Sequence, residues 1–332
     1  MKLSFQASQR AFEKAPRTFA RFANAAAVCE GWYPVARAAR LSRGEVRRVW
    51  IGERDLVLYR DLAGALQALD RRCPHLGADL AQGRVVEQGL QCAFHGWCWG
   101  PQGVRSAGSA AGAIGGMEGK RRIRSYAARE KWGLAWIWAG DGPPAYELPE
   151  PQPENRAHVL RLPPQRLACH PHVMLGNGLD LSHVGPVHRF RFEEDPALEL
   201  EPPHRLSADV HARFGPTWMR RLLGLAGRTA RWRFTTIGPS LAWVQVSAPT
   251  PFELVWAGRP LPGGGCAAQT LFFLPRRRSL VRALPMMVAT TWADRRILEG
   301  IEFTPGFVAS DSAFALYAEL LEDLPEWTRT PA

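Results

Sequence analysis

The 332-residue sequence lacks any uninterrupted apolar run close to the roughly 20 residues that a membrane-spanning helix needs. Its most apolar stretches, residues 134–139 and 285–293, have only the length of a β-strand. The N-terminal residues lack the apolar core of a secretory signal peptide. We therefore expect no membrane span and no secretory leader.

Cysteine is also sparse, and the few cysteines are widely spaced. So few thiols in a chain of this length exclude the disulfide framework that is typical of small secreted proteins. They favour a reducing compartment, so we expect a cytoplasmic protein. The six are Cys29, Cys73, Cys92, Cys98, Cys169 and Cys266.

Lysine is scarce as well, and only four of the 42 basic residues are lysines, although the net charge is +11. This bias towards arginine indicates a GC-rich, bacterial genome. The arginines form pairs and one triplet without a long basic tract or a nucleic-acid-binding motif, so we expect no nucleic-acid partner. Solvated surface is the default interpretation, and docking of an acidic redox partner is the other one.

Residues 1–30 form a basic N-terminal segment with two interpretations. An organellar transit peptide is one of them, and a short surface helix packed on the body of the protein is the one we favour. Its basic residues are Arg10, Lys14, Arg17 and Arg21, which only Glu13 opposes.

The chain length predicts about two domains. Residues 31–142 contain short apolar runs separated by Gly, Asp and Pro, which predicts an all-β domain with a Gly/Ala/Ser-rich loop at residues 105–119. A proline-rich connector follows at residues 143–153. Residues 154–332 mix strand-like and helical patterns, which predicts an α+β domain.

The expected elements of the α+β domain alternate in type along the chain. Helices are predicted at residues 176–183, 293–303 and 310–324. Strands are predicted at residues 205–214, 229–236, 241–247, 252–257, 267–273 and 280–291.

Two Cys/His pairs form the first candidate site. Cys73-Pro74-His75 is followed by Cys92 and His95, and each pair has a spacing that suits one tight loop. Two thiolates with two imidazoles are the ligands of a Rieske-type [2Fe–2S] cluster. A Cys₂His₂ zinc site is the alternative, although zinc sites prefer to pair like ligands. Four unrelated buried residues would be the ordinary interpretation.

A second candidate site follows in the α+β domain. Asn177, Asp180 and His183 are three residues apart, so a helix would place them on one face. Gly185-Pro186 would break that helix and turn His188 back towards His183. Two imidazoles with one carboxylate form the facial triad of non-haem iron sites. A polar helix with two surface histidines is the alternative interpretation.

The residues of the first site resemble the Rieske family. The stretch from Cys73 to Trp97 is similar to the cluster-binding stretch of Rieske-type oxygenases, and residues 31–35 and 132–138 resemble the edges of that domain. The resemblance implies that Cys73 and Cys92 hold the inner iron, and that His75 and His95 hold the exposed one.

The respiratory branch of the Rieske family has an additional cysteine pair beside the cluster, which forms a disulfide. Leu76 and Phe94 lie near the predicted ligands here instead. Cys98 has no second cysteine beside Cys73 to pair with, so we expect a free, buried thiol.

The second site resembles the catalytic iron motif of Rieske non-haem iron oxygenases. This resemblance implies that His183 and His188 are iron ligands and that Asp180 connects the iron to a cluster histidine of a neighbouring subunit. Asn177 matches a residue near the iron. The implied fold is an all-β Rieske domain plus an α+β catalytic domain, with an antiparallel sheet and helices in a helix-grip, START-like arrangement.

The third iron ligand of this family is a distant aspartate on a C-terminal helix, which residues 293–300 resemble. Asp294 is therefore the predicted ligand, with Asp311 and Asp323 as the alternatives. The ordinary interpretation of Asp294 is an acid that complements a helix dipole. His170 and His172, which precede the motif, are expected to be structural.

The resemblance implies the terminal oxygenase of a multicomponent system. It uses O₂ to hydroxylate or oxidatively demethylate a hydrophobic or aromatic small molecule, and cis-dihydroxylation stays open. The sequence has no Gly-rich dinucleotide fingerprint, so a separate reductase or ferredoxin delivers electrons and NAD(P)H acts only indirectly. A homotrimer or another ring is implied. A Rieske electron carrier or redox sensor without catalytic iron is the alternative.

An apolar substrate pocket is expected in the α+β domain. At each candidate position we favour packing in the core over contact with the substrate, because buried apolar residues mostly pack. The candidates are Val173, Met174, Phe190, Phe192, Trp243, Phe272, Met286, Met287 and Trp292.

Overall fold

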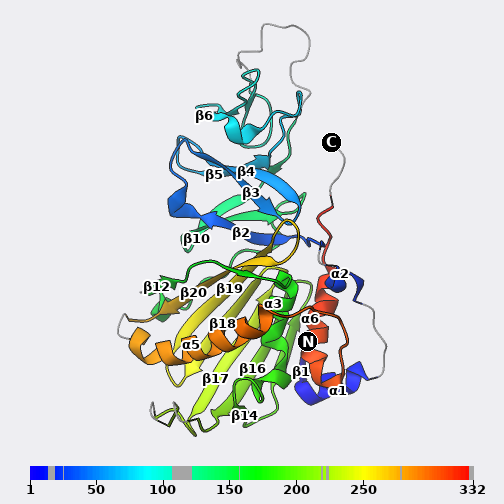
Figure 1. Ribbon diagram of the computed structural model, residues 1–332, viewed down its shortest axis with the longest axis vertical. Coiled ribbons are helices and arrows are strands. Elements are labelled where there is room, and N and C mark those ends of the chain that lie inside the picture. Colours follow the sequence, from blue (N-terminus) through cyan, green and yellow to red (C-terminus); the bar gives the residue numbers. More distant parts are fainter. Residues whose placement is uncertain are drawn as a thin grey trace. The chain divides into compact units, whose positions relative to one another are not determined.

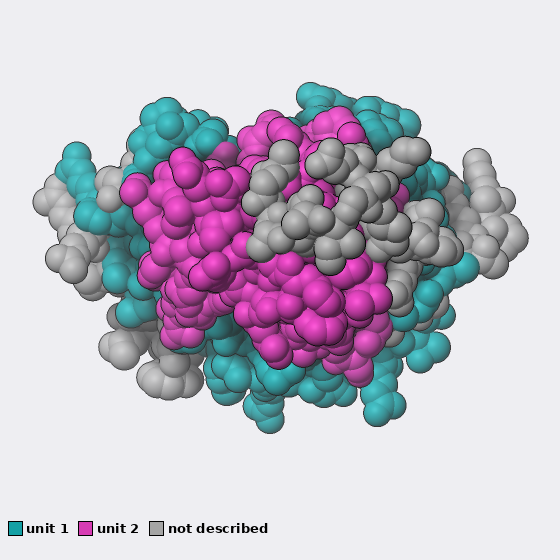
Figure 2. Space-filling view, turned by 90° about the horizontal axis from the view of Figure 1, so that it is seen from above, with its two compact units in different colours: residues 1–30, 148–260, 264–332 teal, residues 31–147, 261–263 magenta. Residues whose placement is uncertain are grey.

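The computed structural model describes residues 1–13, 19–24, 26–106, 122–156, 158–217, 220–221, 224–276 and 279–328. The chain divides into two compact units, which Figure 2 distinguishes by colour. Unit 1 comprises residues 1–30, 148–260 and 264–332, and unit 2 comprises residues 31–147 and 261–263. Within the described residues, no helix is both long enough and apolar enough to cross a membrane.

Unit 2 consists of three small antiparallel sheets (Figure 1). Every residue of β11 (Leu134–Ala139) is buried, which explains why this strand is a continuous apolar run. The sheets are β10 (Ala128–Lys131), β11 and β2 (Gly31–Arg37); β3 (Val46–Ile51), β4 (Arg54–Arg60), β5 (Leu66–Asp70) and β9 (Ser125–Tyr126); and β6 (Arg84–Val86), β7 (Gly89–Gln91) and β8 (Cys98–Trp99). The expected loop at residues 105–119 falls mostly on residues 107–121, outside the described residues.

Unit 1 is built on one antiparallel sheet of ten strands, in the order β1-β15-β16-β17-β18-β19-β20-β12, with β13 on β20 and β14 on β16. The predicted fold class, an all-β domain plus an antiparallel sheet with helices, is confirmed. The strands are β1 (Lys2–Ser4), β12 (His158–Arg161), β13 (Gln165–Leu167), β14 (Phe190–Phe192), β15 (Ala197–Glu201), β16 (Arg205–Phe214), β17 (Thr229–Ile237), β18 (Leu241–Ala248), β19 (Phe252–Pro260) and β20 (Cys266–Leu274).

Helices accompany this sheet, and the longest of them, α5 (Ser279–Leu298), crosses it in Figure 1. Ala283 and Met287 of α5 are buried against sheet residues such as Phe272. Near the N-terminus, α1 packs against α6, so the described part of the basic segment belongs to unit 1. Further α-helices of unit 1 are α1 (Phe5–Phe12), α2 (Ala20–Ala23), α3 (Pro171–Gly176) and α6 (Ser312–Asp323).

Three predicted elements of unit 1 differ from the structure. Residues 280–291 are part of α5 rather than a strand, because Leu280, Ala283, Leu284 and Met287 follow the three-to-four-residue spacing of a helix. This helix also begins before residue 293 and ends at Leu298, not at residue 303.

The helix predicted at residues 176–183 is also absent. Instead α3 ends at Gly176, and the short 3₁₀ turns η5 (Asn177–Leu179) and η6 (Leu181–Val184) follow. Asp180 interrupts the helical path with ψ 82°, because its carboxylate caps η6 by accepting from the N–H groups of Ser182 and His183. His183 therefore lies in η6 and not in a continuation of α3.

Candidate metal centres and substrate cavity

Two loops of unit 2 carry the predicted cluster ligands, and their backbone hydrogen bonds are equivalent. The N–H groups of Cys73 and Cys92 each donate to the carbonyl five residues later, at 2.9 and 2.8 Å. Gly77 and Gly96 then donate back to the carbonyl of the cysteine in their own loop, at 2.8 and 3.0 Å. Both glycines have a positive φ, 76° and 70°, which side chains disfavour. Each loop therefore needs its glycine to present a cysteine and a histidine together.

The four side chains lie at two depths. Cys73 and Cys92 are 1% and 3% exposed, whereas His75 is half-buried and His95 is exposed. The two imidazole rings lie 4.6 Å apart between centroids. Soft thiolates inside and imidazoles outside suit a two-iron cluster whose outer iron has the histidines. The residues present therefore fit the group that the sequence predicts.

A single zinc ion fits these four residues less well. In the described part of the chain, His183, His188 and Asp294 are the one group of at least three His, Cys, Asp or Glu donors within 4.8 Å of one another. The four Cys/His donors are spread more widely, as two bridged irons require. All six cysteines are buried and none forms a disulfide, which includes Cys98 as predicted.

A cation lies over the Trp97 ring, which itself stacks on the predicted ligand His75. The Trp97 ring stacks on His75 at 4.2 Å between centroids with an interplanar angle of 6°. The guanidinium carbon of Arg105 lies 4.2 Å from the Trp97 centroid. This permanent charge favours the reduced, more negative state of a cluster held by His75.

Replacing Arg105 by glutamine is expected to favour the oxidised cluster by about threefold to tenfold at a fixed mediator potential. A tenfold change corresponds to about 59 mV for one electron. A redox titration followed by visible absorption measures the shift. The Arg105→Lys variant keeps the charge and should retain most of the wild-type potential. An unchanged potential in Arg105→Gln contradicts the electrostatic role.

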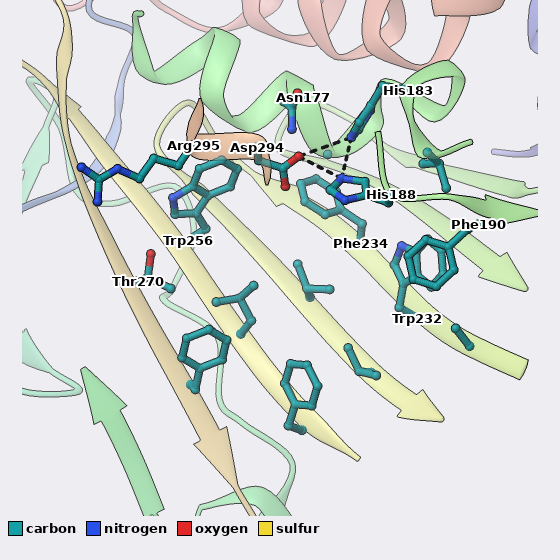
Figure 3. Close-up of a pocket in the computed structure, with 18 of the residues that line it drawn as sticks. Asn177, His183, His188, Phe190, Trp232, Phe234, Trp256, Thr270, Asp294 and Arg295 are labelled. Atoms are coloured by element: carbon teal, nitrogen blue, oxygen red, sulfur yellow. Dashed lines mark hydrogen bonds and ion pairs between the residues drawn. The ribbon is translucent and has the colours of Figure 1, made fainter. Parts of the chain in front are cut away.

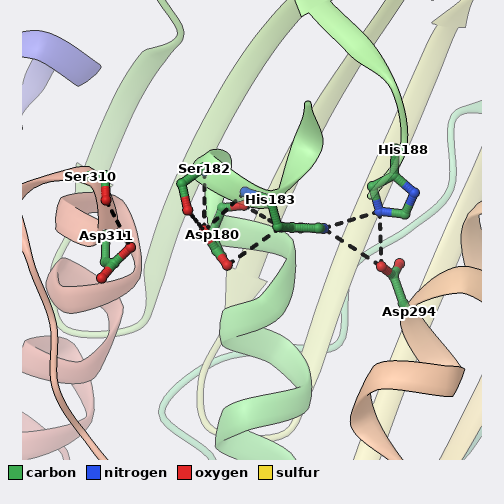
Figure 4. A network of polar contacts seen from close by, with 7 residues as sticks. All are labelled: Asp180, Ser182, His183, His188, Asp294, Ser310 and Asp311. Atoms are coloured by element: carbon green, nitrogen blue, oxygen red, sulfur yellow. Dashed lines mark hydrogen bonds and ion pairs between the residues drawn. The ribbon is translucent and has the colours of Figure 1, made fainter. Parts of the chain in front are cut away.

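The second candidate site begins with the cap of η6 in unit 1 (Figure 4). Asp180 Oδ1 accepts from the Ser182 hydroxyl at 2.5 Å and from the N–H groups of Ser182 and His183 at 3.1 and 3.3 Å. The Asp180 carbonyl accepts from His183 Nδ1, so Nδ1 carries the ring proton. His183 Nε2 is therefore left as a lone-pair donor, as a metal ligand requires.

His188 and Asp294 meet this nitrogen from two other segments. His183 Nε2 lies 3.0 Å from His188 Nε2 and 3.6 Å from Asp294 Oδ1. His188 Nε2 lies 2.9 Å from the same Asp294 oxygen. The three side chains are only 9–17% exposed. Two neutral nitrogens and one carboxylate in this space suit a divalent non-haem metal ion.

The negative charge of the group lies on Asp294. Burial alone would raise the pKa of Asp294, but hydrogen bonds with His183 and His188 lower it to about 2. Burial alone would lower the pKa of His183, but Asp294 and Asp180 raise it above its ordinary value. Asp294 is thus a carboxylate at neutral pH and supplies the single negative charge of the group.

The other residues predicted for this site are placed differently. Asn177 lines the adjoining cavity. Asp311 Oδ2 instead accepts from the Val308 N–H at 3.0 Å, as a cap of its own turn. Asp323 is exposed at the end of α6. Of the three candidate carboxylates, the structure therefore brings Asp294 alone to the histidines.

Arg220 is a residue of the site that the sequence analysis missed. Its Nη2 donates to the His188 carbonyl at 2.7 Å, and its Nη1 donates to the Arg189 carbonyl at 3.1 Å. The same guanidinium lies 4.9 Å from the Phe190 ring centroid and 5.0 Å from that of Phe214. Arg220 therefore fixes the turn that presents His188. No sequence pattern connects Arg220, one of two adjacent arginines, to a turn about thirty residues earlier.

A cavity of about 150 Å³ adjoins the three donors, and its lining is mostly apolar (Figure 3). Alternate residues of two strands point into it, Trp232 and Phe234 from β17 and Leu254 and Trp256 from β19. The sequence contains this alternation, which could have predicted which side chains of the two strands line the cavity. Its aromatic residues are Phe190, Trp232, Phe234, Phe252, Trp256 and Phe272.

Of the nine candidates for the lining, Phe190 and Phe272 line the cavity. Val173 and Met174 lie in the core of unit 1, as apolar residues of a buried helix do. Phe192 and Trp292 are 39% and 62% exposed. Two further candidates pack elsewhere, Trp243 against Phe273 and Met287 against its own core cluster, and the side chain of Met286 lies outside the described residues.

His170 and His172 do not line the cavity. His170 caps α3, since its Nδ1 accepts from the His172 N–H at 3.2 Å. Burial lowers the pKa of His170 to about 4 and that of His172 well below its ordinary value. The unfolded chain therefore binds protons that the folded chain excludes between about pH 6.5 and pH 4.

The free energy of unfolding is expected to be highest above pH 6.5 and to fall towards pH 4, by about 3 kcal/mol for His170 alone. The His172→Phe variant should lose less stability between pH 7.5 and pH 5 than the wild type does. Urea unfolding at both pH values measures this difference. An equal loss in the two proteins would exclude His172 as a source of the pH dependence.

Residues 31–117 match the family model for the Rieske [2Fe-2S] domain. The chain therefore contains a Rieske domain. The matched residues include both loops that present Cys73, His75, Cys92 and His95.

Sequence relatives extend the similarity beyond this domain. The 5,5'-dehydrodivanillate O-demethylase oxygenase subunit of Sphingobium sp. is 38% identical over 37% of this chain and 29% of its own length. The 3-chlorobenzoate-3,4-dioxygenase oxygenase subunit of Comamonas testosteroni is 32% identical over 51% of this chain and 41% of its own length. The chain thus matches less than half of the length of these relatives.

Structural similarity covers nearly the whole chain. The structure of Pseudomonas putida CBB5 NdmA with caffeine has a TM-score of 0.67 and 18% identity, over 88% of this chain and 89% of that one. The protein thus contains a Rieske domain and has a fold similar to that of NdmA. Together, domain, fold and relatives confirm the predicted similarity to terminal oxygenases of the Rieske non-haem iron family.

Proposed function

We propose that this chain is the terminal oxygenase of a multicomponent Rieske oxygenase. It hydroxylates or oxidatively demethylates a hydrophobic, aromatic small molecule with O₂. The observation that supports this most directly is the group of His183, His188 and Asp294 at the wall of an aromatic cavity. When bound, a Rieske cluster supplies single electrons and a ferrous iron activates O₂.

The residues of the chain have separate tasks in this proposal. Cys73, His75, Cys92 and His95 hold the cluster, and the triad of unit 1 holds the iron. Asp180 fixes the tautomer of His183 through its carbonyl, which keeps Nε2 available to the metal. The apolar lining excludes water and binds the substrate against the same three donors.

Partners follow from what the chain lacks and from its relatives. A reductase or ferredoxin is proposed as the electron donor, because the sequence has no dinucleotide fingerprint. A ring of subunits, usually a trimer, is proposed so that Asp180 faces the cluster histidine of a neighbouring subunit. The two curated relatives are named for aromatic compounds, which supports an aromatic substrate for this chain. A cytoplasmic location is part of the proposal.

Iron and acid-labile sulfide in anaerobically purified protein provide the first test. Roughly three irons per two sulfides, with Rieske-type absorption and electron-dependent O₂ consumption that an aromatic compound stimulates, is the expected result. Roughly two irons per two sulfides, unchanged when ferrous iron is added, would reject the oxygenase. That result would instead favour an electron carrier or a redox sensor.

A further inference from the structure

The cavity has one strongly polar point away from the triad. Besides the triad, its polar lining residues are Gln165, Asn177, Thr270 and Arg295. Of these only Arg295 carries a charge, and no other arginine or lysine among the described residues lines the cavity. A single arginine in a mostly apolar cavity, away from the Asp294 carboxylate, favours a ligand that carries a negative charge.

Arg295 is directly adjacent to Asp294 in α5, so both side chains reach the same cavity from one helical turn. In Figure 3, Arg295 extends to the side opposite His183 and His188, where Trp256 and Thr270 are also drawn. Thr270 and Trp256 are partners across β20 and β19. One cavity is thus lined by the polar residues Arg295 and Thr270 and, on another side, by the three candidate metal ligands.

The guanidinium of Arg295 is held by a hydrogen bond from its Nε, whereas its Nη groups make none within the described residues. Its Nε donates to Glu299 Oε1 at 2.6 Å, an (i, i+4) pair on α5. Within the described residues, no polar group contacts its Nη atoms. The side chain is 46% exposed, so this pair contributes little to stability. Two Nη groups therefore remain to bind a planar anion in the bidentate manner that arginine favours.

We propose that the substrate is an aromatic carboxylate whose carboxylate binds Arg295. Its ring then lies among Trp232, Phe234 and Trp256, and the position that reacts faces the triad. The Thr270 hydroxyl, in a residue only 6% exposed, supplies a hydrogen bond beside the arginine. This inference rests on the proposed function, because it assigns the substrate class of the same site.

Benzoate and benzamide form a suitable pair of probes, since they have nearly the same shape and differ in charge. Isothermal titration calorimetry on anaerobic, iron-loaded protein at pH 7.5 measures both. We expect benzoate to bind about tenfold more tightly than benzamide. The Arg295→Gln variant should lose about tenfold in benzoate affinity and change less than about twofold towards benzamide.

Arg296→Gln is the matched control. Arg296 lies on the same helix and has the same charge, but its guanidinium lies over the exposed Trp292 ring at 5.9 Å and does not line the cavity. This variant should keep the wild-type affinity for both probes. An Arg295→Lys variant should keep part of the preference for benzoate, because it retains the charge without the fork.

Three results overturn the proposal. They are equal affinity of the wild type for both probes, an equal loss of both affinities in Arg295→Gln, and an equal loss of benzoate affinity in Arg296→Gln. The first of these results is measured on the wild type alone, so the proposal can be rejected even if a variant misfolds. Arg295-dependent benzoate binding without any O₂ consumption would instead reject the proposed function. O₂ consumption stimulated by neutral aromatics, without charge preference, would reject the carboxylate alone.

Discussion

Replacing Asp294 by alanine is expected to remove the mononuclear iron and to reduce substrate-stimulated O₂ consumption by at least about 100-fold. Asp294 supplies the one carboxylate of the triad, 2.9 Å from His188 Nε2, and its low pKa keeps it ionised at neutral pH. Without it, two histidines alone would have to hold the ion. The iron content should fall from roughly three to roughly two atoms per two sulfides.

Asp323→Ala is the matched control for this variant. Asp323 is the exposed carboxylate at the end of α6, distant in sequence from the histidines. Its removal should leave iron content, visible absorption and O₂ consumption at wild-type values. The Rieske absorption should also be unchanged in Asp294→Ala, since the cluster loops lie in unit 2. Retention of the third iron in Asp294→Ala would show that another carboxylate is the ligand.

Replacing Asp180 by asparagine is expected to retain both metal sites and to lose most of the substrate-coupled O₂ consumption, about 100-fold or more. The backbone carbonyl that accepts from His183 Nδ1 remains in this variant, so His183 keeps its tautomer. The carboxylate Oδ2, 3.7 Å from His183 Nδ1, is lost together with its negative charge. The comparison therefore isolates the charge that is proposed to couple the two sites.

Ser182→Ala separates this charge from the local hydrogen bonds. It removes the hydroxyl that donates to Asp180 Oδ1 at 2.5 Å but leaves the carboxylate and the two backbone donors. We expect an activity within about threefold of the wild type. Iron analysis, the visible spectrum and O₂ uptake are measured on both variants. Wild-type turnover in Asp180→Asn would exclude a coupling role for this carboxylate.

The candidate metal sites could be predicted from the sequence because their ligands are close together or chemically distinctive. Cys73 and His75 lie in one loop, and Cys92 and His95 lie in another, so local spacing carried the prediction. Asp294 was predicted through a resemblance, since no local pattern connects it to His183. Strands β16 to β20 of unit 1 were predicted because apolar residues alternate along them, as in β16 (Arg205–Phe214), whereas the five shorter strands of the same sheet were not predicted.

The errors have two physical causes, which are tertiary contacts and one local cap. Residues 280–291 are apolar enough for a strand, and only their packing across the sheet makes them part of α5. The helix predicted through Asp180 failed because this carboxylate caps the turn that follows. The sequence did not show which of the candidate apolar residues line the cavity, because burial alone does not tell which side of a strand faces an empty space.

The two histidines and Asp294 lie about a hundred residues apart in sequence, on a short turn and on a long helix respectively. A metal ion that joins them would close a chain loop of this length, which makes metal affinity and the stability of unit 1 two measures of the same equilibrium. Removal of the metal ion by a chelator would then destabilise the packing of α5. A substrate that strengthens metal binding would also raise the free energy of unfolding of unit 1.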